Sequence, residues 1–295
     1  MAAALDHEGV EIELVTGVRG NLIKVESGER AMPASVEAVR LKRSIDEALR
    51  MWERFAYAEA AEMLGRMRCP ASSPLYQTFW RAEGLSRAFA AWDCFDHIRA
   101  WEIAEDFRPF LGKVLPGLIP VLHTLTREGK AQEPARIFDL FLNAKRCAAR
   151  GRFDDAVARL YRMVEWSAQW LLRALAGIDT ADVPEAALPE GMVLAENRRG
   201  KRQAGLFQAW RLAAYHLGGE VAAFWGREEE RLLDLIEARN RSILAHGFEP
   251  VGEKAWQAFS GWVEGSLIPV MLERTAALGV KALPPQLPQR MPELG

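Results

Sequence analysis

The sequence GREEERLLDLIEARNRSILAHGF, residues 226–248, decides the fold class of this chain. Its apolar residues recur every three or four positions, which is the spacing of one face of an α-helix. At about 100° per residue, one stripe of this helix contains Leu232, Ile236, Arg239, Ile243 and His246. A buried guanidinium without a partner is costly, so we expect this stripe to line a cleft or to meet a second chain.

The same helix is expected to begin at the ionic residues 227–230, because acidic side chains suit a helix N-terminus. Gly247 is a typical stop signal. Elsewhere, proline and glycine clusters separate stretches of helix length. These breaks fall at residues 69–74, 108–109, 116–120, 129–134, 151, 182–191, 198–203 and 218–219. The pattern predicts a mainly α fold, a helical bundle.

Two segments depart from the helical pattern. Residues 10–32 alternate apolar and polar positions around Gly17 and Gly20, which predicts a short N-terminal β-hairpin. The proline-rich end has little periodicity and is expected to be extended or disordered. The expected organisation is a hairpin in residues 1–34, a helical connector in 35–130, a helical domain in 131–281 and a tail in 282–295.

The charge balance argues against a broad basic surface. The chain has 38 Lys and Arg residues against 40 Asp and Glu residues, so any contact with nucleic acid must be local. The three cysteines have no paired spacing, and we expect no disulfide framework, no metal and no cofactor. No stretch is typical of a signal peptide or a membrane span, so we expect a cytoplasmic protein without membrane contact.

The densest basic run lies in an expected loop and contains Arg198, Arg199, Lys201 and Arg202. It is a candidate contact for a nucleic-acid backbone, and a solvated loop explains it equally well. Cys94 and His97 offer only one possible ligand each, so a structural helical pair is the better interpretation than zinc. Asp154 and Asp155 suit the N-terminus of a helix that follows Gly151.

The end of the quoted helix resembles a known motif. Arg241 and His246 are separated by four residues, and Arg239, followed by Asn240, is separated from His246 by six. Both spacings fit the R-x4-6-H motif of HEPN-domain ribonucleases. The shorter spacing favours Arg241, and the polar residue after the arginine favours Arg239, so both remain candidates.

The resemblance extends beyond the motif. Residues 141–171, FLNAKRCAARGRFDDAVARLYRMVEWSAQWL, resemble the opening helical pair of HEPN domains in CRISPR-associated ancillary nucleases that carry a CARF nucleotide sensor. Residues 90–103 are similar to the helical connector of that group, and the expected hairpin to the closing strands of its sensor. The resemblance implies a HEPN-type bundle. The residues before Val10 leave no room for a CARF sensor, which is expected to be missing or reduced to a remnant.

This resemblance implies a metal-independent endoribonuclease that cleaves single-stranded RNA in CRISPR-linked antiviral defence. His246 is the expected acid and base group, because histidine titrates near neutral pH. Arg241 or Arg239 would hold the phosphate through its forked donors. Asn240 or Ser242 could orient the histidine or the ribose. The expected products are a 2′,3′-cyclic phosphate and a 5′-hydroxyl.

One histidine per chain is few for two proton transfers, and the resemblance implies a homodimer with a composite active site. A cyclic oligoadenylate activator, or a separate sensor partner, is also expected from the resemblance. The alternative is a non-catalytic HEPN-like helical dimer that binds a nucleotide or a protein. In that reading, the basic residues of the last helical turn only stabilise the interface or the helix end.

Overall fold

The computed structural model describes residues 36–240 and 250–292, with the side chains of residues 38–237 and 250–292. The described residues are mainly helical, as predicted. They contain one isolated antiparallel bridge, between Glu196 and Arg202, and no β-strand. The hairpin expected in residues 10–32 lies outside them. No helix in this part of the chain has the length and apolar character needed to cross a membrane.

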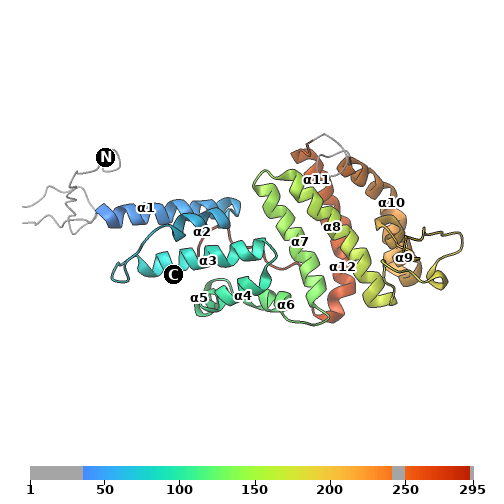
Figure 1. The fold of residues 1–295 in the computed structure, drawn as a ribbon, viewed down its shortest axis with the longest axis horizontal. Coiled ribbons are helices and arrows are strands. Elements are labelled where there is room, and N and C mark those ends of the chain that lie inside the picture. The colour runs from blue at the N-terminus through green and yellow to red at the C-terminus, as the bar shows by residue number, and fades with distance from the viewer. Residues whose placement is uncertain (1–35, 241–249, 293–295) are drawn as a thin grey trace, which may run out of the picture. The chain divides into compact units, whose positions relative to one another are not determined.

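The chain divides into two compact units. The first unit contains the described residues up to Ala90 together with residues 289–291. It comprises α1 (Val36–Met51), the 3-10 turn η2 (Trp52–Arg54), α2 (Tyr57–Gly65) and most of α3 (Tyr76–Asp93), the blue and cyan helices of Figure 1. Its core surrounds Trp52, whose indole Nε1 donates to the Ser86 hydroxyl at 2.9 Å and whose ring packs edge-on against Tyr57 and Phe89.

The second unit contains the described residues of 91–288 and residue 292. Its longer helices are α4 (His97–Glu105), α6 (Leu118–Thr126), α7 (Gln132–Ala149), α8 (Phe153–Leu171), α9 (Leu206–Leu217), α10 (Gly219–Asn240), α11 (Glu253–Trp262) and α12 (Ile268–Thr275). The shorter elements are α5 (Arg108–Val114), the π turns η3 (Leu172–Ala176) and η5 (Val263–Leu267), and the 3-10 turns η4 (Glu185–Ala187) and η6 (Ala276–Leu278).

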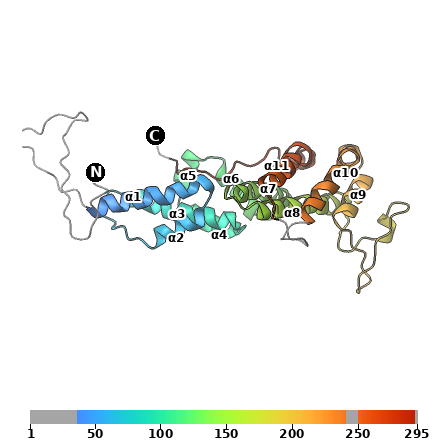
Figure 2. The same ribbon diagram turned by 90° about the horizontal axis from the view of Figure 1, so that it is seen from above.

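Helices α7 and α8 form the centre of this unit. They lie side by side in both Figure 1 and Figure 2, joined by a tight turn at Gly151, whose φ of +73° favours glycine. Phe138 and Phe141 of α7 and Leu160 of α8 are fully buried in one core with residues of α9 to α12. The predicted break at residue 151 is confirmed by this turn.

The prediction that a helix begins at residues 227–230 is wrong. Helix α10 begins at Gly219, directly after a turn in which Gly218 and Gly219 both have positive φ, so the break predicted there is the true start. Phe224 and Trp225 are buried and continue the apolar stripe ahead of the ionic residues 227–230. Packing of this stripe outweighs the cost of an internal Gly226, about 1 kcal/mol relative to alanine.

Candidate functional site

Helix α10 carries the first part of the predicted motif. Leu232 and Ile236 are buried in the core of the second unit, as the helical stripe predicted. Arg239 lies in the last turn of α10, three positions after Ile236 and therefore about 60° from it around the helix axis. The side chains of Arg239 and Asn240, and the whole of Arg241, Ser242 and His246, lie outside the described residues.

Glu228 holds α10 against the helices that follow the motif. Its carboxylate accepts hydrogen bonds from the Trp262 indole Nε1 at 2.6 Å and from the Ser266 hydroxyl at 3.0 Å. Trp262 ends α11, and Ser266 lies in the π turn η5. This acidic residue was expected to favour a helix start, whereas its position in the middle of α10 gives it a tertiary role.

The described chain continues after the motif at Pro250, and α11 begins at Glu253. The Val251 backbone N–H donates to Asp154 Oδ1 at 3.1 Å. Asp154 lies in the first turn of α8, where the sequence predicted a helix N-terminus. The chain is therefore bonded to the helices of the second unit both before and after the motif.

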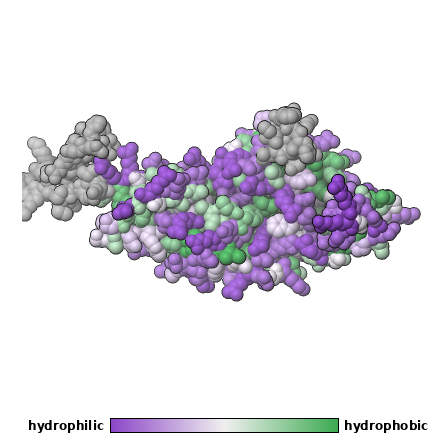
Figure 3. All heavy atoms as spheres, in the orientation of Figure 1, coloured by the Kyte–Doolittle hydropathy of each residue, from purple (hydrophilic) through white to green (hydrophobic). Residues whose placement is uncertain are grey.

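The predicted basic run forms a tight hydrogen-bonded loop between η4 and α9. Asn197 Oδ1 accepts from the backbone N–H groups of Arg199 at 2.8 Å and Lys201 at 3.2 Å, and Gly200 has a φ of +69°. Arg198 and Arg199 are exposed at the tip of this loop, and neither has an ion pair within the described part of the chain. Figure 3 shows strongly hydrophilic side chains gathered where this segment lies in Figure 1.

The other two cations of the run are paired within the same segment. Lys201 Nζ lies 2.9 Å from Asp182 Oδ2, and the hydrogen bond and charge of Asp182 raise the pKa of the Lys201 ammonium. Arg202 contacts Glu196 at 2.9 Å and Glu185 at 3.3 Å. Because acidic neighbours already compensate these charges, Arg198 and Arg199 are the better candidates for contact with an anion.

Sequence reasoning missed a buried ionic group, which we call the Arg146 cluster. It comprises His97 of α4, Asp93 at the end of α3, Asp139, Asn143 and Arg146 of α7, and Arg150, the C-cap residue of α7. Arg146, with no exposed surface, donates from Nε to Asp93 Oδ1 at 2.6 Å and from Nη1 to Gln286 Oε1 at 2.7 Å. The two guanidinium groups of the Arg146 cluster, from Arg146 and Arg150, are balanced by the two carboxylates of Asp93 and Asp139.

Asp93 and His97 make the remaining contacts of the Arg146 cluster. Asp93 Oδ1 also accepts from Asn143 Nδ2 at 2.8 Å, and Asp93 Oδ2 lies 2.8 Å from Arg150 Nη1. Burial lowers the pKa of the Arg150 guanidinium, but the charge and hydrogen bond of Asp93 outweigh this effect and raise it. His97 Nε2 donates to Asp139 Oδ2 at 2.9 Å. One sequence signal could have revealed the cluster, since its α7 members recur every three or four positions on one helical face.

His97 therefore has a structural partner, Asp139, and Cys94 is exposed. Within the described residues, no group of three or more His, Cys, Asp or Glu side chains could hold a metal ion.

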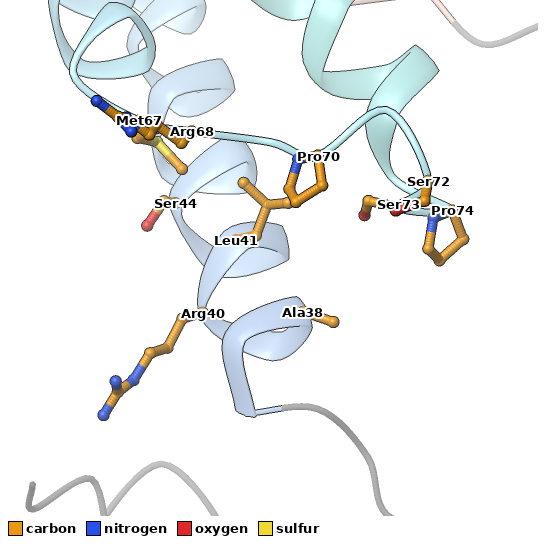
Figure 4. Close-up of a pocket in the computed structure, with 10 residues that line it drawn as sticks. All are labelled: Ala38, Arg40, Leu41, Ser44, Met67, Arg68, Pro70, Ser72, Ser73 and Pro74. Atoms are coloured by element: carbon orange, nitrogen blue, oxygen red, sulfur yellow. The ribbon is translucent and has the colours of Figure 1, made fainter.

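The first unit contains a separate groove of about 630 Å³. It lies between α1 and the segment of residues 67–74, and Figure 4 shows Leu41 of the helix pointing toward Pro70 of the segment. None of the predicted site residues lines this groove.

Comparison with known families gives one match. Residues 126–268, just under half of the chain, match the sequence model of the family described as the Csm6 HEPN domain. The matched residues include α7 to α11 and the whole R-x4-6-H segment. A search of curated proteins finds no match.

Proposed function

We propose that this chain is a CRISPR-associated endoribonuclease that cleaves single-stranded RNA, because residues 126–268 match the sequence model of the Csm6 HEPN domain family. The HEPN domain points to a ribonuclease at the general level. One observation supports the finer proposal most strongly: the family match extends over α10 and the R-x4-6-H segment, residues 239–246. Cytoplasmic antiviral defence is the proposed setting.

The proposed reaction needs only groups of the protein and the RNA. One His246 takes the proton of a ribose 2′-hydroxyl, and the 2′-oxygen attacks the neighbouring phosphorus. The bond from phosphorus to the 5′-oxygen breaks, and a protonated histidine gives its proton to this leaving oxygen. Arg241 or Arg239 neutralises the charge that grows on the phosphate. The products are a 2′,3′-cyclic phosphate and a 5′-hydroxyl, and no metal takes part.

The acid and the base come from two copies of the chain in this proposal. A single imidazole cannot be neutral and protonated at once, so the His246 residues of a homodimer divide the two roles in a composite site. Asn240 and Ser242 orient the histidine or the ribose. The exposed Arg198 and Arg199 contact the RNA backbone, and Lys201 and Arg202 contribute less because Asp182, Glu185 and Glu196 pair with them. A cyclic oligoadenylate, or a separate sensor partner, activates the dimer.

Cleavage of a fluorogenic single-stranded RNA by the purified protein in EDTA tests this function. We expect His246→Ala to lower the rate by roughly 10²-fold or more, the usual contribution of a general acid or base. Arg239→Ala and Arg241→Ala, measured in parallel, identify the phosphate-binding arginine. His123→Ala is the matched control, because His123 is an exposed histidine of α6 outside the matched residues.

The assay is run with and without cyclic oligoadenylates, and sedimentation equilibrium measures the dimer. A dimeric protein that cleaves no RNA under any of these conditions contradicts the proposal and favours the non-catalytic scaffold. Equal losses in His246→Ala and His123→Ala would contradict the role of His246.

A further inference from the structure

Asp154 uses its carboxylate differently from its neighbour in the first turn of α8. Asp155 pairs with Arg152 at 2.6 Å and with Arg159 at 3.5 Å, both close to it in sequence. Asp154 Oδ1 instead accepts the backbone N–H of Val251, 97 residues away in sequence. The helix gains no side-chain cap from its N-cap residue Arg152. The Asp154 carboxylate thus binds the segment that follows the R-x4-6-H motif, at Val251, and does not cap α8.

This hydrogen bond fixes the chain shortly after the R-x4-6-H segment. Val251 follows His246 by five residues, and Pro250 between them has no backbone N–H to offer. Five residues span at most about 18 Å even when fully extended. On the other side of the motif, Ile236 is buried and Glu228 is bonded to Trp262 and Ser266. The described chain is therefore held by hydrogen bonds on both sides of the R-x4-6-H segment, through Glu228 before it and through Val251 after it.

We infer that Asp154 is a positioning residue for the proposed ribonuclease site, because it holds the Val251 amide and so fixes the exit of the chain from the R-x4-6-H segment. This inference rests on the proposed function. Asp154 acts through the backbone and touches neither RNA nor the reacting atoms. The contact requires an acceptor oxygen but no negative charge, so asparagine can replace aspartate at this position.

The test compares Asp154→Ala, Asp154→Asn and Asp155→Ala in the full-length protein. Asp155→Ala is the matched control, since it removes an acid from the same helical turn but leaves the Val251 contact intact. Two quantities are measured: hydrogen exchange of the Val251 amide, by mass spectrometry with fragmentation, and kcat and KM for the fluorogenic RNA. Circular dichroism establishes that each variant is folded, and Asp154→Ser, with a shorter acceptor, replaces Asp154→Ala if the latter does not fold.

We expect Asp154→Ala to raise the exchange rate of the Val251 amide about tenfold, the factor that corresponds to one hydrogen bond to a charged group. kcat falls by a similar factor while KM stays within about twofold, because a positioning defect acts on the reacting geometry rather than on RNA binding. Asp154→Asn restores both quantities to within about twofold of the wild type, since its amide oxygen accepts the same bond. Asp155→Ala changes neither the exchange of Val251 nor kcat.

Unchanged exchange of Val251 in Asp154→Ala overturns the inference, and so does a loss of kcat equal to that of Asp155→Ala. A wild-type protein that cleaves no RNA is a different result. It contradicts the proposed function, whereas the exchange of Val251 still decides whether Asp154 holds the chain.

Discussion

Removal of the Asp93 carboxylate tests how strongly the Arg146 cluster stabilises the second unit. Asp93→Ala takes away the carboxylate that Arg146 Nε contacts at 2.6 Å and Arg150 Nη1 at 2.8 Å, whereas Asn143 Nδ2 keeps the Asp93 backbone carbonyl at 2.7 Å. The Arg146 side chain has no exposed surface and the Asp93 side chain is only 14% exposed, so water replaces the lost partner poorly.

The expected loss follows from this burial. Removing one partner of a buried ion pair costs about 3–5 kcal/mol, because the other charge remains buried without compensation. Arg146 keeps Gln286 and lies 3.5 Å from Asp139, which places the expected loss at the lower end, about 3 kcal/mol. For a unit of this size, that loss lowers the unfolding temperature by roughly 6–12 °C.

Differential scanning calorimetry of the full-length protein measures this shift. Glu264→Ala is the matched control, since it breaks the pair that Glu264 forms at 3.2 Å with Lys145, the residue next to Arg146 in α7. The two side chains of that pair are 40% and 53% exposed, and such surface pairs contribute about 0–1 kcal/mol. If Asp93→Ala lowers the unfolding temperature no more than Glu264→Ala, the argument from burial is refuted.

The remaining predictions concern the loop and the motif. Asp182 raises the pKa of the Lys201 ammonium, so a smaller fraction of the Lys201 amine is neutral and reactive at pH 8–9. Asp182→Asn should therefore increase acylation of Lys201, measured by peptide mass spectrometry. Unchanged acylation would contradict this pairing. Arg198→Ala and Arg199→Ala should raise KM for RNA with kcat nearly constant and should reduce the salt dependence of binding, and a fall in kcat alone would argue against backbone contact. The rate of RNA cleavage should pass through a maximum between about pH 5 and 8, since one His246 must be neutral and its counterpart protonated, and a rate that rises steadily with pH would exclude this division of roles.

Local signals in the sequence predicted much of the second unit. Glycine at positions 151 and 218–219 marks real turns, because positive φ favours glycine whatever the surroundings. The start of α10 was misplaced for a tertiary reason. Residues 227–230 have the charge pattern of a helix N-terminus, but the burial of Phe224 and Trp225 continues the helix through Gly226.

Partnership between charges was harder to predict than their positions. The basic run was found from composition, but the acidic partners of Lys201 and Arg202 become visible only when the loop folds back on Asp182 and Glu185. Arg146 and Asp93 are 53 residues apart, and neither residue alone signals burial. The R-x4-6-H motif remains a prediction from sequence spacing, and the family match supports its context.

The Arg146 cluster also determines where this chain can be divided by recombination. The family match starts at residue 126, yet the charges of α7 that lie after this point are compensated by Asp93 and His97, which lie before it. A fragment that begins at residue 126 would lack Asp93, the nearest carboxylate to the buried Arg146 guanidinium at 2.6 Å, and would keep only Asp139 at 3.5 Å. We therefore expect a transferable fragment that keeps these contacts to include Asp93 and His97, and the second unit, which begins at Ala91, contains both.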